Sequence, residues 1–325
     1  MPKRISWKKG MRLTDEVLLS ADKCTTETIG HALTLAAAGR YGLFPSARPF
    51  LLSLNVQKGF VSIEALDCMA ITRGGDIIDV QFDTKYSDVT DARVEIPSQT
   101  DEKEFILTVN TSADRWQETE EGLLEPRYTF ELISAKAAVG LHAMPIGRIV
   151  YEDGWRVENS QFVPPCLFLS SHHRYEELYA QFLDILRSID SKTAAQLNTG
   201  AREAITIYWP IVQQVLVTFN TEHELLTPQM FQSCVQRVVA AFTCACDLDE
   251  VVTLEDADTL RNYARVPFNY RIAYARIKQG MGMCFAIGEK IDKFSLLVKR
   301  EEPKQELRPA PEAPKPKRFW EGKQI

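Results

Sequence analysis

Residues 162–167, Phe-Val-Pro-Pro-Cys-Leu, divide the chain into two parts with different patterns of apolar residues. Pro164 and Pro165 fix the backbone angle φ and donate no hydrogen bond, so they end sheet pairing and stiffen the connection that follows. Cys166 and Leu167 then offer a small and a large apolar side chain to the elements beneath them. We therefore predict that a β-rich segment ends at this junction and that a helical segment begins beyond it.

Before the junction, the sequence predicts short antiparallel strands from residue 50 to about residue 157. Apolar and polar residues alternate there, as in strands with one buried face. Gly74 and Gly75 predict a tight turn between two strands, because glycine adopts positive φ angles readily. The expected strands cover 50–56, 60–63, 68–72, 76–82, 105–109, 128–132, 146–151 and 155–157. Such a series indicates an antiparallel β-sandwich or a barrel-like sheet.

After Ser171 the apolar residues recur at the spacing of amphipathic helices. The first expected helix covers 175–189. The second covers 205–219, where Pro210 either kinks the helix or marks its first turn. Thr227 followed by Pro228 predicts the start of a third helix, since Thr is a favoured N-cap and proline is favoured at the first helical position.

The last expected helix carries a heptad-like seam over about three repeats. Its members are spaced alternately by four and three residues: Tyr270, Tyr274, Ile277, Met281, Cys284, Gly288 and Ile291. Such a seam suits the core of a four-helix bundle within one chain and contact between copies of the chain equally well.

The end of the chain has a different composition. Five of the sixteen prolines fall between residues 303 and 316, mixed with Lys and Glu, which predicts a disordered tail. Phe319 and Trp320 follow the basic run 315–318. Two adjacent aromatic residues in such a tail indicate a docking peptide; the alternative is an incidental chain end.

These patterns predict an α+β protein of three parts. An antiparallel β-sandwich or barrel-like domain, with an N-terminal arm, covers 1–170. An α-helical bundle covers 171–298, and the Pro-rich tail covers 299–325.

Composition restricts the classes of function. The 325-residue chain has a formal net charge of −6, so it lacks the general phosphate attraction of a nucleic-acid-binding protein. Its seven scattered cysteines favour reduced thiols. Asp15 and Glu16 stand where a signal peptide needs an apolar run, and no apolar cluster approaches the ~18 residues of a membrane span. We expect a cytoplasmic protein without nucleic acid or direct membrane insertion.

No recognisable motif in the sequence supports catalysis. Gly280 and Gly282 do not complete a dinucleotide-binding fingerprint. Cys244 and Cys246 have no second pair at zinc-ligand spacing, and the His172-His173 pair has no identifiable metal-binding partners. We therefore expect neither an enzyme nor a bound cofactor or metal.

Three segments resemble one family, the TssK-type baseplate subunits of type VI secretion systems. The opening, with Trp7, Gly10 and Leu13, is similar to that family's W-x-x-G-x-x-L start. The run 147–167, ending in Val-Pro-Pro-Cys-Leu, is similar to the segment that closes its β-rich shell domain and leads into the helical neck. The Thr227-Pro228 helix start resembles that of a neck helix.

The resemblance implies a structural adaptor that forms homotrimers. It implies that the arm with Trp7, Gly10 and Leu13 binds a wedge of TssF- and TssG-like subunits, and that Tyr270, Tyr274, Ile277 and Met281 belong to the trimer-forming neck. Pro164, Pro165, Cys166 and Leu167 would form the shell–neck junction. Family members contact an inner-membrane complex through a C-terminal head domain, which nothing after residue 294 could form. Either the tail with Phe319 and Trp320 replaces that contact and recruits the protein to the inner membrane, or another subunit makes the contact, or the contact is missing.

Two other classes of protein fit the same pattern. A phage-type tail or receptor-binding protein would share the β-sandwich and the trimer. An enzyme or small-ligand binder would require a pocket with converging polar groups.

Overall fold

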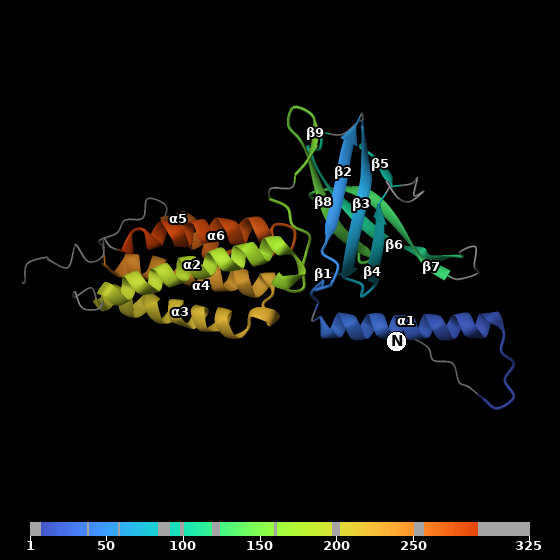
Figure 1. Ribbon diagram of the computed structural model, residues 1–325, viewed down its shortest axis with the longest axis horizontal. Helices are drawn as coiled ribbons and strands as arrows, with labels where there is room; N and C mark the ends of the chain where they lie inside the picture. Colours follow the sequence, from blue (N-terminus) through green and yellow to red (C-terminus); the bar gives the residue numbers. More distant parts are fainter. Residues whose placement is uncertain are drawn as a thin grey trace, which may run out of the picture.

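The computed structural model describes residues 8–37, 39–57, 59–83, 92–97, 101–118, 124–158, 161–196, 202–249 and 257–291. Two β-sheets occupy the middle of the molecule, a helical bundle extends from one end of them, and a separate helix extends in the opposite direction (Figure 1). The expected α+β class, with antiparallel sheets followed by helices, is confirmed.

The first sheet is built around one long central strand, β3 (Phe60–Ile71). β1 (Gly42–Leu43) and β2 (Leu51–Gln57) pair along one side of it, and β4 (Ile77–Asp83) and β5 (Arg93–Glu95) along the other, all antiparallel. The sequence predicted two strands, 60–63 and 68–72, where the structure has only β3. Buried and less buried residues alternate on both sides of the adjacent buried pair Ala65 and Leu66, and the carboxylates of Glu64 and Asp67 bond neighbouring side chains.

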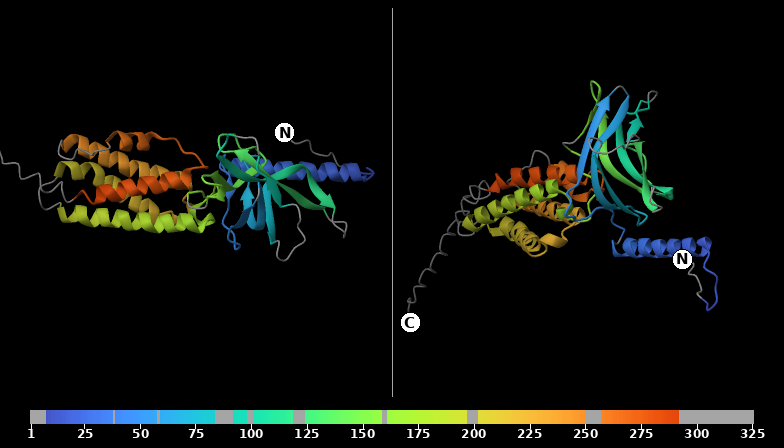
Figure 2. Two further views of the ribbon diagram at one scale, coloured as in Figure 1. Left: turned by 90° about the horizontal axis from the view of Figure 1, so that it is seen from above. Right: turned by 45° about the vertical axis from the view of Figure 1, so that its right-hand side comes forward.

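The second sheet has the strand order β7-β6-β8-β9 and is also antiparallel. Its strands are β6 (Glu104–Glu118), β7 (Leu124–Ser134), β8 (Ala143–Tyr151) and β9 (Trp155–Val157). The two sheets pack on each other and, among the described residues, do not close into a barrel (Figure 2). Their shared core is apolar and contains Ile63, Leu66, Cys68, Ile78, Leu107, Val109, Met144 and Ile146.

Four helices form the bundle, as the periodicity predicted. They are α2 (His173–Gln196), α3 (Arg202–Thr221), α4 (Pro228–Asp249) and α6 (Ala273–Gly288), and α5 (Ala257–Arg265) packs against α4. Pro210 lies inside α3. Thr227 Oγ1 accepts a hydrogen bond from the Met230 amide at 3.1 Å, so the predicted N-cap of α4 is confirmed.

The helix α1 (Asp15–Ala36) was not expected from the sequence. Thr14 caps it by accepting a hydrogen bond from the Val17 amide, and Asp15 and Glu16 lie in its first turn, where the helix dipole favours negative charge. None of its residues is buried. Without a buried stripe, the helical period that revealed the other helices is missing, which explains why the sequence analysis passed over it.

Candidate interaction surfaces

The N-terminal arm is described from Lys8 onward. Gly10 has a φ of +84° in a turn closed by the Met11 amide, which donates to the Lys8 carbonyl at 3.0 Å. Leu13 is 63% exposed immediately before the N-cap of α1. Trp7 lies outside the described residues. The two placed members of the predicted arm therefore lie at an exposed turn and next to an unburied helix.

The surface of α1 is unusually apolar for a helix that buries none of its residues in its own chain. Five large apolar side chains in and just before it are at least half exposed: Leu13, Leu18, Leu19, Ile29 and Leu35. Leu19 and Leu35 point to different sides of the helix, since 16 residues at 100° each leave them about 160° apart. A helix in water gains most of its stability from packing an apolar face, which α1 does not do within this chain.

The Pro-Pro junction connects the sheets to the helices. Pro164, Pro165 and Cys166 are buried, and Leu167 is half-buried. The Leu43 amide donates to the Pro165 carbonyl at 2.8 Å, and the Leu167 amide donates to the Leu43 carbonyl at 2.8 Å. The junction does not simply end sheet pairing: it passes beside β1 in a single parallel bridge between Leu43 and Cys166.

The predicted seam of the last helix lies inside one chain. Tyr274, Ile277 and Met281 on α6 are at most 6% exposed and belong to the same apolar core as α2 and α4. Of the two alternatives for this seam, the structure shows contact within the chain. A surface for other copies must use different side chains.

Tyr270 does not belong to the last helix, and this corrects the sequence analysis. Asn269 forms a turn ahead of α6, in which its Oδ1 accepts from the Arg271 amide at 3.0 Å and its carbonyl accepts from the Ile272 amide. The Tyr270 ring packs against Tyr41 at 4.8 Å between ring centroids. Burial raises the pKa of Tyr270 to about 12. Tyr270 therefore holds the bundle to the sheets.

Two arginines strengthen the same boundary. Arg271 donates to the Ala135 carbonyl at 2.8 Å and also to the Ala137 carbonyl, both in the loop between β7 and β8. Arg174 on α2 donates to the Phe162 carbonyl at 3.0 Å and lies 4.3 Å from the centre of the Tyr274 ring. Bonds from a charged donor are about twice as strong as neutral ones, so they favour a fixed orientation of the bundle on the sheets.

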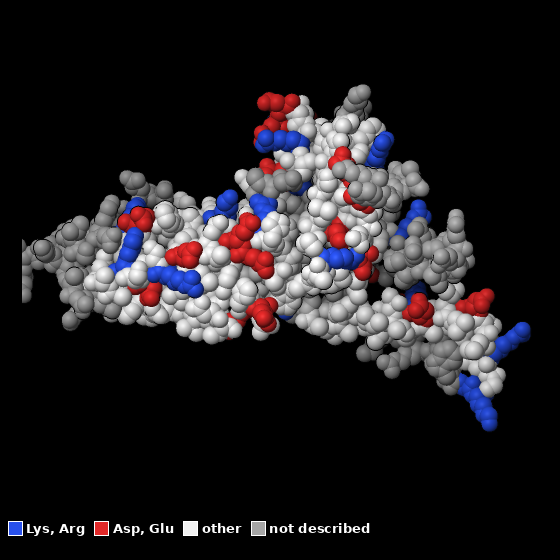
Figure 3. Space-filling view, in the orientation of Figure 1, with Lys and Arg blue, Asp and Glu red and all other residues white. Residues whose placement is uncertain are grey.

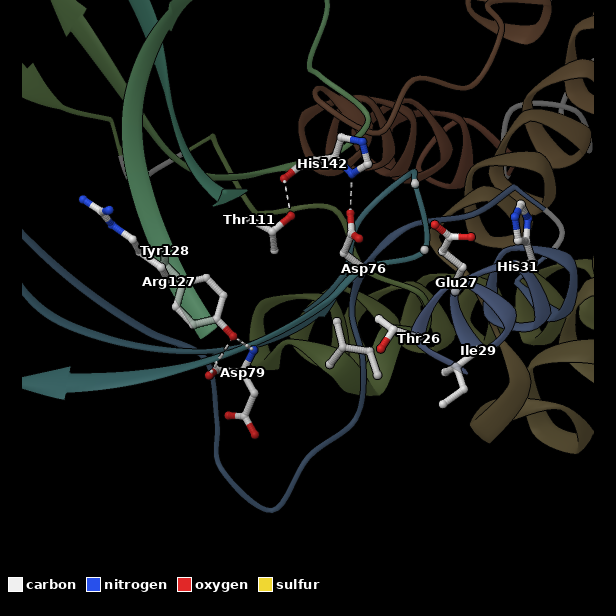
Figure 4. Close-up of a pocket in the computed structure, with 14 residues that line it drawn as sticks. Thr26, Glu27, Ile29, His31, Asp76, Asp79, Thr111, Arg127, Tyr128 and His142 are labelled. Carbon is white, nitrogen blue, oxygen red and sulfur yellow. Dashed lines mark hydrogen bonds and ion pairs between the residues drawn. The ribbon is translucent and has the colours of Figure 1, made fainter. Parts of the chain in front are cut away.

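A cavity of about 450 Å³ opens between α1 and the β3–β4 turn (Figure 4). His142 Nδ1 lies 2.6 Å from an Asp76 carboxylate oxygen, and on the other side the Tyr128 hydroxyl accepts from the Asp79 amide at 3.0 Å. Apolar and polar groups both line it: Thr26, Glu27, Ile29, Gly30, His31, Gly74, Gly75, Asp76, Ile77, Asp79, Thr111, Arg127, Tyr128 and His142. The sequence analysis missed it because α1 supplies one wall.

The glycine turn forms the floor of this cavity. Only Gly75 of the predicted pair has a positive φ, of +86°. A β carbon on Gly75 would overlap the Gly30 carbonyl of α1 and approach Thr34 Oγ1. The glycine therefore serves the close approach of α1 as well as the turn.

The buried thiols are unsuited to nucleophilic chemistry. Burial raises the pKa of Cys68 and Cys284 to about 12 and holds that of Cys166 well above its usual value, so these groups stay protonated. Among the described residues, no group of three or more His, Cys, Asp or Glu could hold a metal ion. No described helix is long and apolar enough to cross a membrane.

Charge is mixed on the face shown in Figure 3. Basic and acidic side chains alternate over the described parts of the bundle and the sheets, and neither sign gathers into a broad patch there. The described residues on this face therefore form no extended basic footprint for a polyanion.

Comparisons with known proteins match the fold. No protein-family model matches the chain, and no curated protein matches its sequence. Among solved structures, the crystal structure of TssK is 14% identical with a TM-score of 0.57, covering 93% of this chain and 71% of that one. A chain of the TssK-TssF-TssG baseplate subcomplex of the type VI secretion system is 11% identical, with a TM-score of 0.53. A chain of the baseplate complex from the type VI secretion system is 12% identical, with a TM-score of 0.54. Both matches cover 88% of this chain and 99% of the other.

These likenesses show the fold: it is similar to that of chains in solved type VI secretion baseplate structures. The chain has a TssK-type fold. The expectation drawn from the three resembling segments is confirmed at the level of the fold.

Proposed function

We propose that this protein is a non-enzymatic structural subunit of a type VI secretion baseplate. One observation carries the proposal: the TssK-type fold extends over 88% of this chain and 99% of a chain of the TssK-TssF-TssG subcomplex. Both sheets and the bundle are thus represented. The buried, protonated thiols agree with a structural role.

The working form of the protein is a homotrimer in which α1 makes contacts between copies. The seam of α6 is occupied within the chain, whereas α1 presents Leu18, Leu19 and Leu35 to solvent at 51%, 60% and 81% exposure. Apolar side chains on several sides of one helix suit a site where several chains meet. Three copies also repeat each further contact three times, so weak contacts combine into high avidity.

Different parts of the chain bind different partners. The arm with Trp7, Gly10 and Leu13 binds a wedge of TssF- and TssG-like subunits, and the exposure of Leu13 leaves it accessible for this contact. The tail with Phe319 and Trp320, outside the described residues, contacts a component of the inner-membrane complex. The protein then resides in the cytoplasm and is recruited to the inner membrane.

Native mass and co-purification test this proposal. The wild type should have the mass of three chains and should capture TssF- and TssG-like subunits. Leu19→Ser/Leu35→Ser should yield single chains, whereas Val217→Ser, at a 58% exposed position on α3, should stay trimeric. Trp7→Ala/Leu13→Ala should lose the wedge and keep the trimer. A monomeric wild type would refute the trimer, and a wild type that captures no wedge subunit would refute the baseplate role.

A further inference from the structure

The cavity between α1 and the β3–β4 turn has the size and shape of a docking site. Its volume of about 450 Å³ falls within the roughly 300–1,000 Å³ of typical ligand pockets. Ile29 on α1 and Ile77 on β4 are both about half exposed and line it from different elements, with the Tyr128 ring of β7 beside them. An aromatic side chain entering between them would bury apolar surface on three sides.

Glu27 offers the cavity one carboxylate with which a basic occupant can pair. Three carboxylates, those of Glu27, Asp76 and Asp79, and one guanidinium, that of Arg127, line the cavity. Asp76 is paired with His142, and Asp79 with Arg48 of the neighbouring loop. Glu27 is exposed and has no ion pair among the described residues. A Lys or Arg beside the aromatic group would supply that missing partner.

One segment of this chain outside the described residues has this composition: 315–320, Lys-Pro-Lys-Arg-Phe-Trp. About 28 residues separate Phe319 from Ile291, the last described residue, and at roughly 3.1 Å per residue they span up to about 85 Å when extended. The 24-residue α2, which runs along the bundle, is only about 36 Å long. The tail therefore reaches from the far end of the bundle to the cavity.

The N-terminal arm has a similar composition but the wrong location. Trp7 directly precedes Lys8, and the described residues before α1 lead away from the sheets beyond the first turn of α1 (Figure 1). The cavity is lined instead by residues 26–31 of that helix. The described part of the arm therefore lies away from the cavity.

We infer that residues 315–320 dock into this cavity of the same chain. An aromatic ring of Phe319 or Trp320 lies between Ile29 and Ile77, and the preceding basic residues face Glu27. The docking rests on the cavity and the tail, not on the baseplate role. If the proposed membrane contact of the tail also holds, docking withholds the tail from that partner until it is released.

A labelled peptide of residues 312–322, titrated by fluorescence anisotropy into the isolated full-length protein, tests this inference. The receptor is the Phe319→Ala/Trp320→Ala variant, whose own tail should leave the cavity free. We expect saturable binding to this variant and at least fivefold weaker binding to the wild type, whose tail competes. Glu27→Lys and Ile77→Asp in the receptor should each weaken binding at least fivefold. Glu177→Lys, on an exposed position of α2, should not.

A charge exchange adds specificity: a peptide with Arg318→Glu should bind the Glu27→Lys receptor better than the unmodified peptide does. The inference is overturned if the peptide does not bind, if wild type and receptor bind it equally, or if Glu27→Lys and Ile77→Asp leave the titration unchanged. Because no wedge subunit is present, any of these results would leave the baseplate proposal standing.

Discussion

Gly42 in β1 packs directly against the backbone of Pro165, more than a hundred residues later in the chain. Gly42 has a φ of +133°, and a β carbon on it would overlap the Pro165 carbonyl and crowd the Cys166 nitrogen at 2.6 Å. This close approach lets Leu43 exchange backbone hydrogen bonds with Pro165 and Leu167. The passage from the sheets to the helices therefore depends on the absence of a side chain at Gly42.

Gly42→Ala should destabilise the protein by about 3 kcal/mol, because the new methyl group meets backbone that cannot rotate away and φ is unfavourable. Urea unfolding followed by far-UV circular dichroism measures the change. Gly59→Ala is the control: φ there is +85°, but nothing lies within 4 Å of the added carbon, so only about 1 kcal/mol should be lost. Equal losses in the two variants would contradict the packing argument.

Replacing each of two glycines of α6 with alanine should change the stability of the protein in opposite directions. A β carbon on Gly280 would overlap the Tyr263 ring of α5 and crowd Val235 of α4, so Gly280→Ala should cost roughly 1–3 kcal/mol. Gly282 has nothing within 4 Å, and Gly282→Ala should stabilise the helix by about 0.5–1 kcal/mol. Thermal unfolding of both variants tests this. A stabilised Gly280→Ala variant would show that α5 is not held closely against α6.

Met281→Glu should unfold the bundle rather than only separate copies of the chain. Met281 is 4% exposed in the core of the bundle, and an unpaired buried charge costs roughly 3–5 kcal/mol. Phe285→Glu, at a 58% exposed position on the same helix, should leave the fold intact. Circular dichroism and native mass distinguish the outcomes. A folded, monomeric Met281→Glu variant would instead assign the seam to contacts between chains.

Stability should fall as the pH is lowered from about 6.5 towards 3, partly because of His172. Burial, and then the neighbouring charges of His173 and Arg174, lower the pKa of His172 to about 3, against an ordinary value of 6.5. In this window the unfolded chain binds a proton at His172 that the folded chain does not, so acid favours unfolding by up to about 1.4 kcal/mol per pH unit.

The comparison with His172→Gln isolates this contribution. In the wild type, the free energy of unfolding from urea titrations at pH 4.5 and 7 should differ more than in the variant. The His172 Nδ1 atom accepts from the Arg174 amide at 3.2 Å, and the glutamine carbonyl offers a neutral acceptor in its place. An identical pH dependence in both proteins would rule out His172 as a source of acid sensitivity.

The helices of the bundle that the sequence predicted are long ones whose apolar residues face the core of their own chain, whereas the short elements β1 and α5 were missed although Leu43 and Tyr263 are buried. The stripe of α4, with Phe231, Val235 and Phe242, is fully buried, and the N-cap at Thr227 is where the Thr-Pro pair indicated. The sequence analysis did not predict α1 because the helix buries none of its residues, although Thr14 followed by Asp15 and Glu16 is a typical helix start. A helical spacing of apolar residues arises when one face of a helix packs against a core, so a helix without such a face does not show it.

The features of the candidate site also fall into two groups, those that the sequence could predict and those that it could not. The Pro-Pro junction could be located from local chemistry, because proline restricts the backbone wherever it occurs. Its pairing with Leu43 could not, since that contact joins distant parts of the chain. The cavity at Gly75 depends on the position of α1 in space, and Ile29 and Ile77 show no relation in the sequence. The exposed faces of α1 likewise became visible only when the burial of each side chain was known.

The bridge between Leu43 and Cys166 also has a mechanical consequence. A force that pulls α1 away from the bundle would be transmitted through residues 37–41 to β1, and from β1 to the segment 165–167 that leads to α2. The two backbone bonds of this parallel bridge, which join Leu43 to Pro165 and to Leu167, would carry that load. Tension applied to α1 would thus reach the helices through β1, a strand of the first sheet.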